Sequence, residues 1–268
     1  MSKKPDEQLV KAITDVALMN SSSSRDATGL AWFQGGAVHG TKGGLPASEF
    51  IPKVYEKIPK DVGILICHTR NQTRGSHLVN SNNHPVNKDG IFLVHNGVVY
   101  PREGIQEEGV VDTMMLVEAA AKGNNLKEGI VNTSLDVSGS YACAVLSNRE
   151  PDTLFLYRHG SPLYLSYLPT LETIFFATAI EDVEDALAEY KPLLGGLFNK
   201  RIYPTHYNAK LAEDTLLILR GNLTWESCKL KESPIMTSSW LMCKKCASWH
   251  SKSDSCSYGY RGGGLWEQ

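Results

Sequence analysis

The 268-residue sequence has no long apolar run, almost no net charge and few cysteines outside its C-terminal segment. No stretch approaches the roughly 20 consecutive apolar residues that a transmembrane helix needs. The first residues, Met1 to Gln8, lack the apolar core of a secretory signal peptide. We therefore expect a soluble, cytoplasmic protein without a membrane partner.

The charge balance excludes a second class of protein. Lys and Arg number 27 against 29 Asp and Glu, giving a formal net charge of -2 and a pI near 6.4. No global basic field exists to hold a polyanion by charge alone, which disfavours a dedicated nucleic-acid binder.

The cysteines suggest how the chain is divided. Cys67, Cys143 and Cys228 are scattered, whereas the other three lie close together near the C-terminus. This spacing argues against a disulfide framework. With 42% hydrophobic residues the chain can build a full core, so we expect a main domain at 1–225 and a short tail at 226–268.

Apolar periodicity predicts helices mixed with antiparallel strands. Expected helices cover 7–19, 47–58, 110–122 and 181–190, and expected strands cover 28–33, 37–41, 63–67, 91–94, 140–147, 153–158, 163–167, 173–178 and 215–220. A polar loop is expected from 71 to 90, and His95-Asn96-Gly97 is expected to end the strand at 91–94. This pattern indicates an α+β protein with stacked sheets covered by helices.

Short polar motifs recur at the ends of these elements. In chain order they are Arg25-Asp-Ala-Thr-Gly29, His68-Thr-Arg-Asn-Gln-Thr-Arg-Gly75, Asn82-Asn-His-Pro85, His95-Asn-Gly97, Asp112-Thr113 and Gly139-Ser-Tyr141, followed by Pro151-Asp-Thr-Leu, Arg158-His-Gly-Ser-Pro-Leu163 and Phe176-Ala-Thr178. Together they resemble the glutaminase domain of class II glutamine amidotransferases over residues 8 to 220. The resemblance implies the four-layer αββα sandwich of N-terminal-nucleophile (Ntn) hydrolases, with two stacked antiparallel sheets between helices.

Arg70 and Asp112 fit the recognition of a free amino acid. One guanidinium can hold an α-carboxylate through two bonds, and one carboxylate can hold the α-ammonium. The resemblance places the glutamine carboxylate on Arg70 and its amine on Asp112, with Thr73 and Arg74 lining the pocket. The family usually has His at the position of Arg74. A structural ion pair between Arg70 and Asp112 remains the alternative.

Asn96 and Gly97 fit the stabilisation of an oxyanion. Amide hydrolysis passes through a tetrahedral oxyanion that needs preorganised donors, and an Asn amide beside an unhindered Gly N–H supplies two. The resemblance assigns them this catalytic role, and the alternative is an ordinary Asn-Gly hairpin turn. His68, His84 and His95 are expected to be structural, because this chemistry needs no imidazole base.

The family's nucleophile is an N-terminal Cys followed by a buried strand, and this sequence begins Met1-Ser2-Lys3-Lys4-Pro5. In one explanation the true start lies upstream and supplies the Cys. In a second, Ser2 is exposed by removal of Met1 and attacks through its hydroxyl. In a third, the protein is a non-catalytic relative. Cys67 lies in an apolar run and is expected to be an inert core thiol.

The tail contains a candidate zinc site. Cys243, Cys246, His250 and Cys256 form a C-x2-C-x3-H-x5-C pattern similar to a zinc knuckle. Zinc would explain how so short a segment folds, and a disordered tail is the alternative. Nearby tryptophans, tyrosines and lysines would suit stacking on single-stranded nucleic acid or docking on a protein.

The resemblance implies that, with an N-terminal Cys upstream of Met1, the protein hydrolyses the side-chain amide of L-glutamine and releases ammonia to an unknown acceptor, with no cofactor needed for that step. A separate ammonia-accepting enzyme is the expected partner. The alternative is an inactive amidotransferase-like binding module whose zinc-binding tail contacts nucleic acid or a protein.

Overall fold

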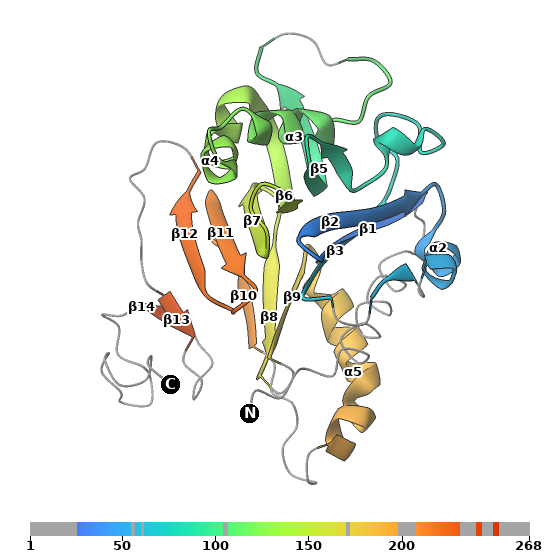
Figure 1. Cartoon of the computed structure of the whole chain (residues 1–268), viewed down its shortest axis with the longest axis vertical. Helices are drawn as coiled ribbons and strands as arrows, with labels where there is room; N and C mark the ends of the chain where they lie inside the picture. Colours follow the sequence, from blue (N-terminus) through green and yellow to red (C-terminus); the bar gives the residue numbers. More distant parts are fainter. Residues whose placement is uncertain are drawn as a thin grey trace.

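The computed structural model describes residues 26–54, 57–59, 62–103, 107–169, 172–197, 207–230, 240–242 and 249–251. In chain order the elements are β1 (Ala27–Gln34), β2 (Ala37–Gly43), α2 (Ala47–Val54), β3 (Ile64–Arg70), a 3-10 turn (Asn80–Asn82), β4 (Val86–Lys88), β5 (Ile91–Pro101), α3 (Thr113–Ala121), α4 (Leu126–Asp136), β6 (Val137–Ser147), β7 (Thr153–His159), β8 (Tyr164–Leu168), β9 (Thr173–Ala177), α5 (Ile180–Leu197), β10 (Tyr207–Lys210), β11 (Thr215–Arg220), β12 (Trp225–Lys229), β13 (Trp240–Met242) and β14 (Trp249–Ser251) (Figure 1).

A six-stranded antiparallel sheet of order β12-β11-β7-β6-β5-β4 forms the centre of the molecule. Apolar residues alternate between its two faces, so each face needs its own cover. Helices α3 and α4 cover one face, where Leu116, Val117 and Ile130 pack against the strands. Two three-stranded sheets, β2-β1-β3 and β10-β8-β9, lie on the other face.

The outer layer consists of α2 and α5. The buried side of α2, including Phe50 and Ile51, packs against Leu30 and Trp32 of β1. Helix α5 contacts β8 and β9 (Figure 1). The order helix, sheet, sheet, helix is the predicted αββα sandwich, with the second sheet layer built from two separate three-stranded sheets.

Some of the predicted helices and strands match the structure in position, and others do not. The hairpin through Gly35-Gly36 and the strand at 28–33 are confirmed, and the helix expected at 110–122 is present as α3, which begins at Thr113. The expected end of a strand at His95-Asn96-Gly97 is wrong, because β5 continues through these residues to Pro101. The expected helix at 7–19 lies outside the described residues.

Three further differences between the prediction and the structure concern short elements or elements with few apolar residues. The loop expected from 71 to 90 contains the 3-10 turn and β4. Helix α4 had no counterpart in the prediction; it begins after Asn125, whose side chain accepts a bond from the amide of Glu128 at 2.8 Å. Strand β12 pairs with β11, so the described sheet continues past residue 225 to Lys229.

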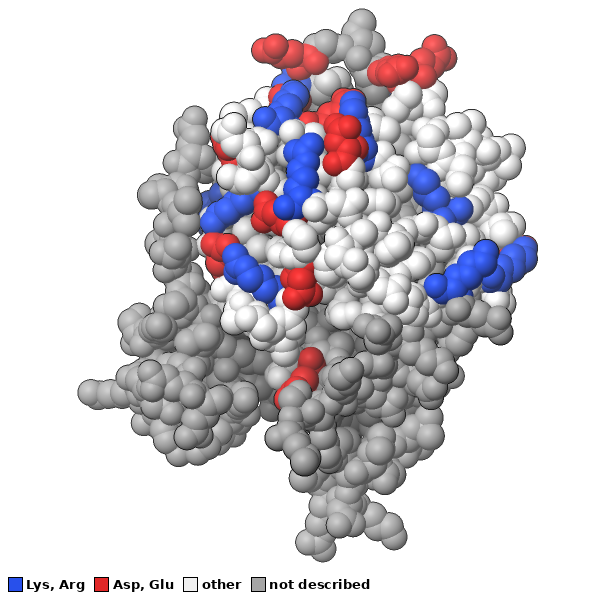
Figure 2. Space-filling view, in the orientation of Figure 1, with Lys and Arg blue, Asp and Glu red and all other residues white. Residues whose placement is uncertain are grey.

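The surface shows mixed charge. On the face seen in Figure 2, Lys and Arg side chains alternate with Asp and Glu among the described residues and do not gather into one basic patch. In the part of the chain that the structure describes, no helix has both the length and the apolar character to cross a bilayer.

Candidate functional site

Arg70 ends β3 in the interior of the protein, with 3% of its surface exposed. Its Nη1 donates to Asn83 Oδ1 at 3.1 Å, and its Nη2 donates to the carbonyls of Arg74 and of Gly75, the latter at 2.8 Å. Burial lowers the pKa of Arg70, and the nearby Asp112 and Asp26 carboxylates oppose this shift. Of five N–H donors, three have partners among the described residues, so two remain for a ligand.

Asp112 immediately precedes α3 and is also 3% exposed. Its Oδ2 accepts a bond from the Val99 amide of β5 at 3.1 Å, and it makes no capping bond to its own helix. Arg70 and Asp112 do not form an ion pair with each other in the described part of the chain. The alternative of a structural ion pair is therefore not what the structure shows.

Two neighbouring asparagines hold the segments that carry these charged residues. Asn83 holds Arg70, and its Nδ2 donates to the carbonyl of His77 at 2.7 Å. Asn82 accepts a bond from the Val111 amide at 3.1 Å, next to Asp112. Both asparagines are buried, so their bonds are shielded from competing water. The sequence showed the Asn-Asn-His-Pro motif, but we assigned these two side chains no role.

Asn96 and Gly97 lie within β5 and not in a hairpin turn, opposite Ala142 and Tyr141 of β6. The side chain of Asn96 is exposed and has no hydrogen-bond partner among the described residues. Gly97 has φ +134°, and a Cβ there would lie 2.1 Å from the carbonyl oxygen of Ser140. Only glycine fits this backbone, and the side-chain amide of Asn96 beside it is open to solvent.

The turn after β7 lies against Gly97. The Oγ of Ser161 would be 3.0 Å from a Cβ at Gly97. Buried Arg158 holds this turn, because its Nε donates to the Ser161 carbonyl at 2.6 Å and its Nη2 pairs with the Glu213 carboxylate.

The side chains of His159, Glu213 and Asp214 offer ligand atoms within 4.8 Å of one another. Each already has a protein partner: Glu213 pairs with Arg158, and His159 Nδ1 lies 2.5 Å from Asp214 Oδ1. The cluster is an ion-pair and hydrogen-bond network that fixes the turn next to Gly97.

Three histidines lie behind the site. The His68 and His84 rings are 4.1 Å apart, and the His84 and His95 rings 6.4 Å, both edge to face. Burial lowers the pKa of His84 well below its usual value, and the charges of His68, His95, Arg70 and Lys42 lower it further. Burial also lowers the pKa of His95, opposed by the Asp112 carboxylate and the Ser140 backbone. Both buried rings are therefore neutral near pH 7.

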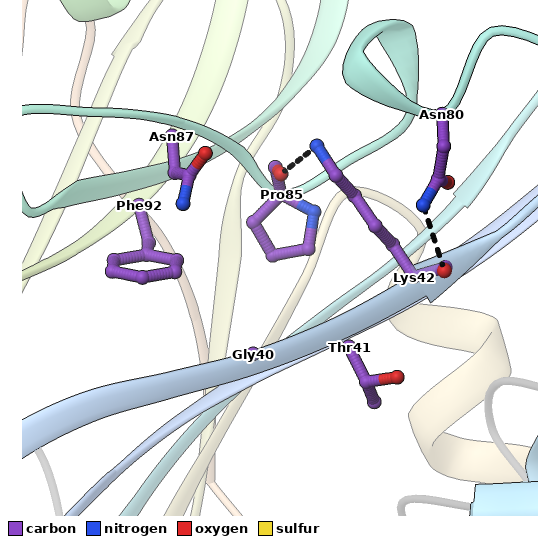
Figure 3. A pocket seen from close by; sticks show the side chains of 7 residues that line it. All are labelled: Gly40, Thr41, Lys42, Asn80, Pro85, Asn87 and Phe92. Carbon is purple, nitrogen blue, oxygen red and sulfur yellow. Dashed lines mark hydrogen bonds between the residues drawn. The ribbon is translucent and has the colours of Figure 1, made fainter.

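A cavity of about 350 Å³ lies on the outer side of the segment that contains His84. Its lining comprises Gly40, Thr41, Lys42, Asn80, Pro85, Asn87 and Phe92 (Figure 3). Lys42 Nζ reaches across it to the carbonyls of Asn83 and Pro85 at 2.7 and 2.8 Å. Burial, with the nearby charge of Arg70, lowers the pKa of Lys42 to about 8.

The remaining predicted site residues lie at the edge of the site or outside the described residues. Thr73 and Arg74 are exposed, and the Arg74 guanidinium lies over the Tyr100 ring, 5.4 Å from its centroid. His250 lies in β14, opposite Leu241 of β13. Met1, Ser2, Cys243, Cys246 and Cys256 lie outside the described residues.

Similar proteins were found by sequence and by structure. The glutamine–fructose-6-phosphate aminotransferase [isomerizing] of Escherichia coli (strain K12) is 28% identical over 130 residues, 44% of this chain and 21% of the relative. The enzyme of the same name from Clostridium perfringens is 36% identical over 118 residues, 39% of this chain and 19% of the relative. The matched region thus spans about a fifth of these relatives. No family model matches the chain.

The glutamine phosphoribosylpyrophosphate amidotransferase of Bacillus subtilis aligns with a TM-score of 0.59 at 15% identity, over 87% of this chain and 48% of that one. The chain resembles a class II glutamine amidotransferase domain. A second structure, the allosteric regulatory enzyme of purine biosynthesis, aligns with a TM-score of 0.58 at 16% identity, over 85% of this chain and 47% of that one. At these identities the structures establish the fold, which is the predicted Ntn-hydrolase sandwich.

Proposed function

We propose that this protein is a cytoplasmic glutamine amidotransferase-like protein that binds L-glutamine and hydrolyses its side-chain amide. One observation carries the proposal: Arg70 and Asp112 are both buried and do not pair with each other in the described part of the chain, and Asp112 accepts a bond from Val99 of β5, the strand that also contains Asn96 and Gly97. A buried cation and a buried anion that do not pair with each other suit a ligand that carries both charges.

In the proposed complex, the α-carboxylate of glutamine accepts hydrogen bonds from Arg70 and its α-ammonium donates to Asp112. These contacts fix one end of the substrate and direct the side-chain amide toward Asn96. Holding the substrate in one orientation removes much of the entropic cost of the reaction.

The proposed chemistry is nucleophilic attack on the amide carbon. The carbonyl oxygen becomes an oxyanion that accepts bonds from the Asn96 side-chain amide and the Gly97 backbone amide. Collapse of this intermediate breaks the carbon–nitrogen bond, and the amine takes up a proton and leaves as ammonia. Water then hydrolyses the acyl-enzyme, which is a thioester if the nucleophile is a cysteine, and releases glutamate.

The cysteines of the described region do not fit the role of nucleophile. Burial raises the pKa of both Cys143 and Cys228, which keeps their thiols protonated. Cys67 packs on the side of β3 that faces α2. The proposed reaction therefore takes its nucleophile from a residue outside the described region, as the upstream-Cys and Ser2 hypotheses require.

The same observation favours a second candidate function. Without a nucleophile, this site would still hold glutamine through Arg70 and Asp112, and the protein would act as a glutamine-binding module. The two functions share the pocket and differ in whether glutamate and ammonia appear.

The ammonia acceptor is also a proposal. The names of the relatives pair glutamine with fructose 6-phosphate, and the matched region spans only about a fifth of their length. We propose a separate enzyme as the acceptor of ammonia from this chain.

The test uses the protein expressed from its native gene with the upstream sequence retained. Mass spectrometry identifies the first residue of the mature chain, and glutamate and ammonia are measured after incubation with L-glutamine. The proposal expects both products in equal amounts and a loss of about 100-fold or more in rate for Asn96→Ala. Glutamine binding without product would reject hydrolysis and leave the binding module.

For the tail we propose a zinc site formed by Cys243, Cys246, His250 and Cys256. In support, the segment that contains Cys243 and Cys246 connects the two antiparallel strands β13 and β14, and paired thiols at this spacing are common zinc ligands. The tail would then present a small folded surface to a protein or nucleic acid. About one zinc per chain, lost in Cys243→Ser, is expected by mass spectrometry of the native protein; metal-free wild-type protein would contradict the site.

A further inference from the structure

One hydroxyl lies between the segments that carry the candidate site. Thr113 is the first residue of α3 and is fully buried. Its Oγ1 lies 2.7 Å from His84 Nε2 and 3.2 Å from His95 Nδ1. Three elements distant in sequence therefore meet at a single oxygen atom.

Each contact involves a neighbour of a site residue. Thr113 follows Asp112, His95 precedes Asn96, and His84 follows Asn83, which holds Arg70. Asp112 and Asn96 are thus one residue away from this cluster, and Arg70 is connected to it through Asn83.

The hydroxyl of Thr113 can bond to both histidine rings at once because both rings are neutral. Both rings are buried, with 5% of His84 and 4% of His95 exposed, and both are neutral near pH 7. A neutral imidazole has one N–H donor and one acceptor nitrogen, whereas a hydroxyl can donate one bond while accepting another. Thr113 can therefore accept a hydrogen bond from one ring and donate a hydrogen bond to the other, which a methyl group cannot do.

The surrounding packing leaves these rings few substitutes. The Nδ1 of His84 is buried and has no partner among the described residues. The backbone of β1 lies directly behind, since a Cβ at Gly29 would be 1.9 Å from the His84 carbonyl oxygen. Loss of the hydroxyl would leave one nitrogen of each buried ring without the partner it has here.

We infer that the Thr113 hydroxyl is a positioning group for the glutamine site. By sharing its hydroxyl between His84 and His95, it fixes the N-terminus of α3 relative to β5 and to the Asn82-Asn83 segment. This holds Asp112, Asn96 and, through Asn83, Arg70 in fixed positions relative to one another. The inference rests on the proposed function, because it takes these three residues as the glutamine site.

The experiment compares Thr113→Val, which keeps the shape but removes the hydroxyl, with Thr113→Ser, which keeps the hydroxyl. Thr133→Val is the matched control, because Thr133 is equally buried and its hydroxyl donates to the Gly129 carbonyl of α4 at 3.2 Å and not, among the described residues, to either ring. Calorimetry with L-glutamine measures binding, and ¹⁵N NMR of the imidazole rings reports the hydrogen bonds of His84 and His95.

We expect glutamine to bind about tenfold more weakly to Thr113→Val, while Thr113→Ser and Thr133→Val bind as the wild type does. The ¹⁵N signals of both rings should change together in Thr113→Val and remain in place in the other two variants. Wild-type affinity in Thr113→Val, or the same loss in Thr113→Ser, would overturn the inference.

Failure of the proposed function gives a different pattern. If the wild type binds no glutamine, the assignment of the pocket is rejected. The ¹⁵N signals of the two rings then test only whether His84 and His95 share the Thr113 hydroxyl. If the ¹⁵N signals of both rings change in Thr113→Val, the hydroxyl is shared between His84 and His95. If the signals of only one ring change, or of neither, the shared hydroxyl is rejected.

Discussion

Arg70 and Asn83 are joined by a buried hydrogen bond of 3.1 Å between a guanidinium nitrogen and a side-chain oxygen. Asn83 is itself held from two sides, because its Nδ2 donates to the His77 carbonyl at 2.7 Å and its own carbonyl accepts from Lys42 Nζ at 2.7 Å. The position of the candidate carboxylate-binding group is thus set in part by the Asn83 side-chain amide.

Replacement of this amide should affect both folding and binding. In Asn83→Ala, Arg70 loses a buried acceptor, and we expect the free energy of unfolding to fall by about 1–3 kcal/mol and glutamine binding to weaken by about tenfold. Urea denaturation and calorimetry measure the two effects. Asn208→Ala is the control, since Asn208 is exposed and bonds to Glu184; equal behaviour of the two variants would refute the role of Asn83.

Gly97 should tolerate no side chain. Gly97→Ala combines a strained φ of +134° with a contact of 2.1 Å to the Ser140 carbonyl oxygen. We expect a loss of stability above the roughly 1–3 kcal/mol of backbone strain alone. Gly35→Ala separates the two causes, because Gly35 has φ +60° with open space around it. Equal losses of unfolding free energy in both variants would show that the close approach to Ser140 is unimportant.

The buried histidines predict a loss of stability in mild acid. Burial, with the charges of His68, His95, Arg70 and Lys42, lowers the pKa of His84 in the folded protein. Between this lowered pKa and about 6.5, the unfolded chain binds a proton that the folded chain does not. Stability is therefore fully present above pH 6.5 and is lost as the pH falls below it.

Unfolding free energies measured from pH 7.5 to 5 test this expectation. The fall in stability should be smaller in His84→Gln, which removes the titrating ring, than in the wild type. His39→Gln serves as control because His39 is exposed, and it should keep the wild-type slope. A slope unchanged in His84→Gln would contradict a neutral buried His84.

The sequence predicted the sandwich because its apolar runs alternate with helical periodicity and carry turn residues between them. It did not predict α4, whose apolar residues are sparse and whose stability comes from packing against α3 and β6. It also ended β5 too early, because an Asn-Gly pair favours a hairpin turn locally, whereas pairing with β6 on one side overrides that preference here.

The site could be predicted only in part, for a similar reason. Arg70, Asp112 and Asn96 are visible as polar residues at predicted element ends, and Gly97 as a glycine next to one of them. The roles of Asn82, Asn83 and Thr113 depend on contacts between segments 13 to 29 residues apart. Such contacts leave no periodic signal in one sequence, because each residue is locally an ordinary polar residue.

Binding of L-glutamine to the wild type and to Asp112→Asn tests the central claim most directly. Asp112→Asn preserves size but removes the negative charge for the α-ammonium, so calorimetry should show binding at least about 30-fold weaker. Glutaramate, which lacks the α-amine, should bind weakly to the wild type and be unaffected by the substitution. Equal affinity of both proteins for L-glutamine, or no binding by the wild type, would contradict the glutamine site.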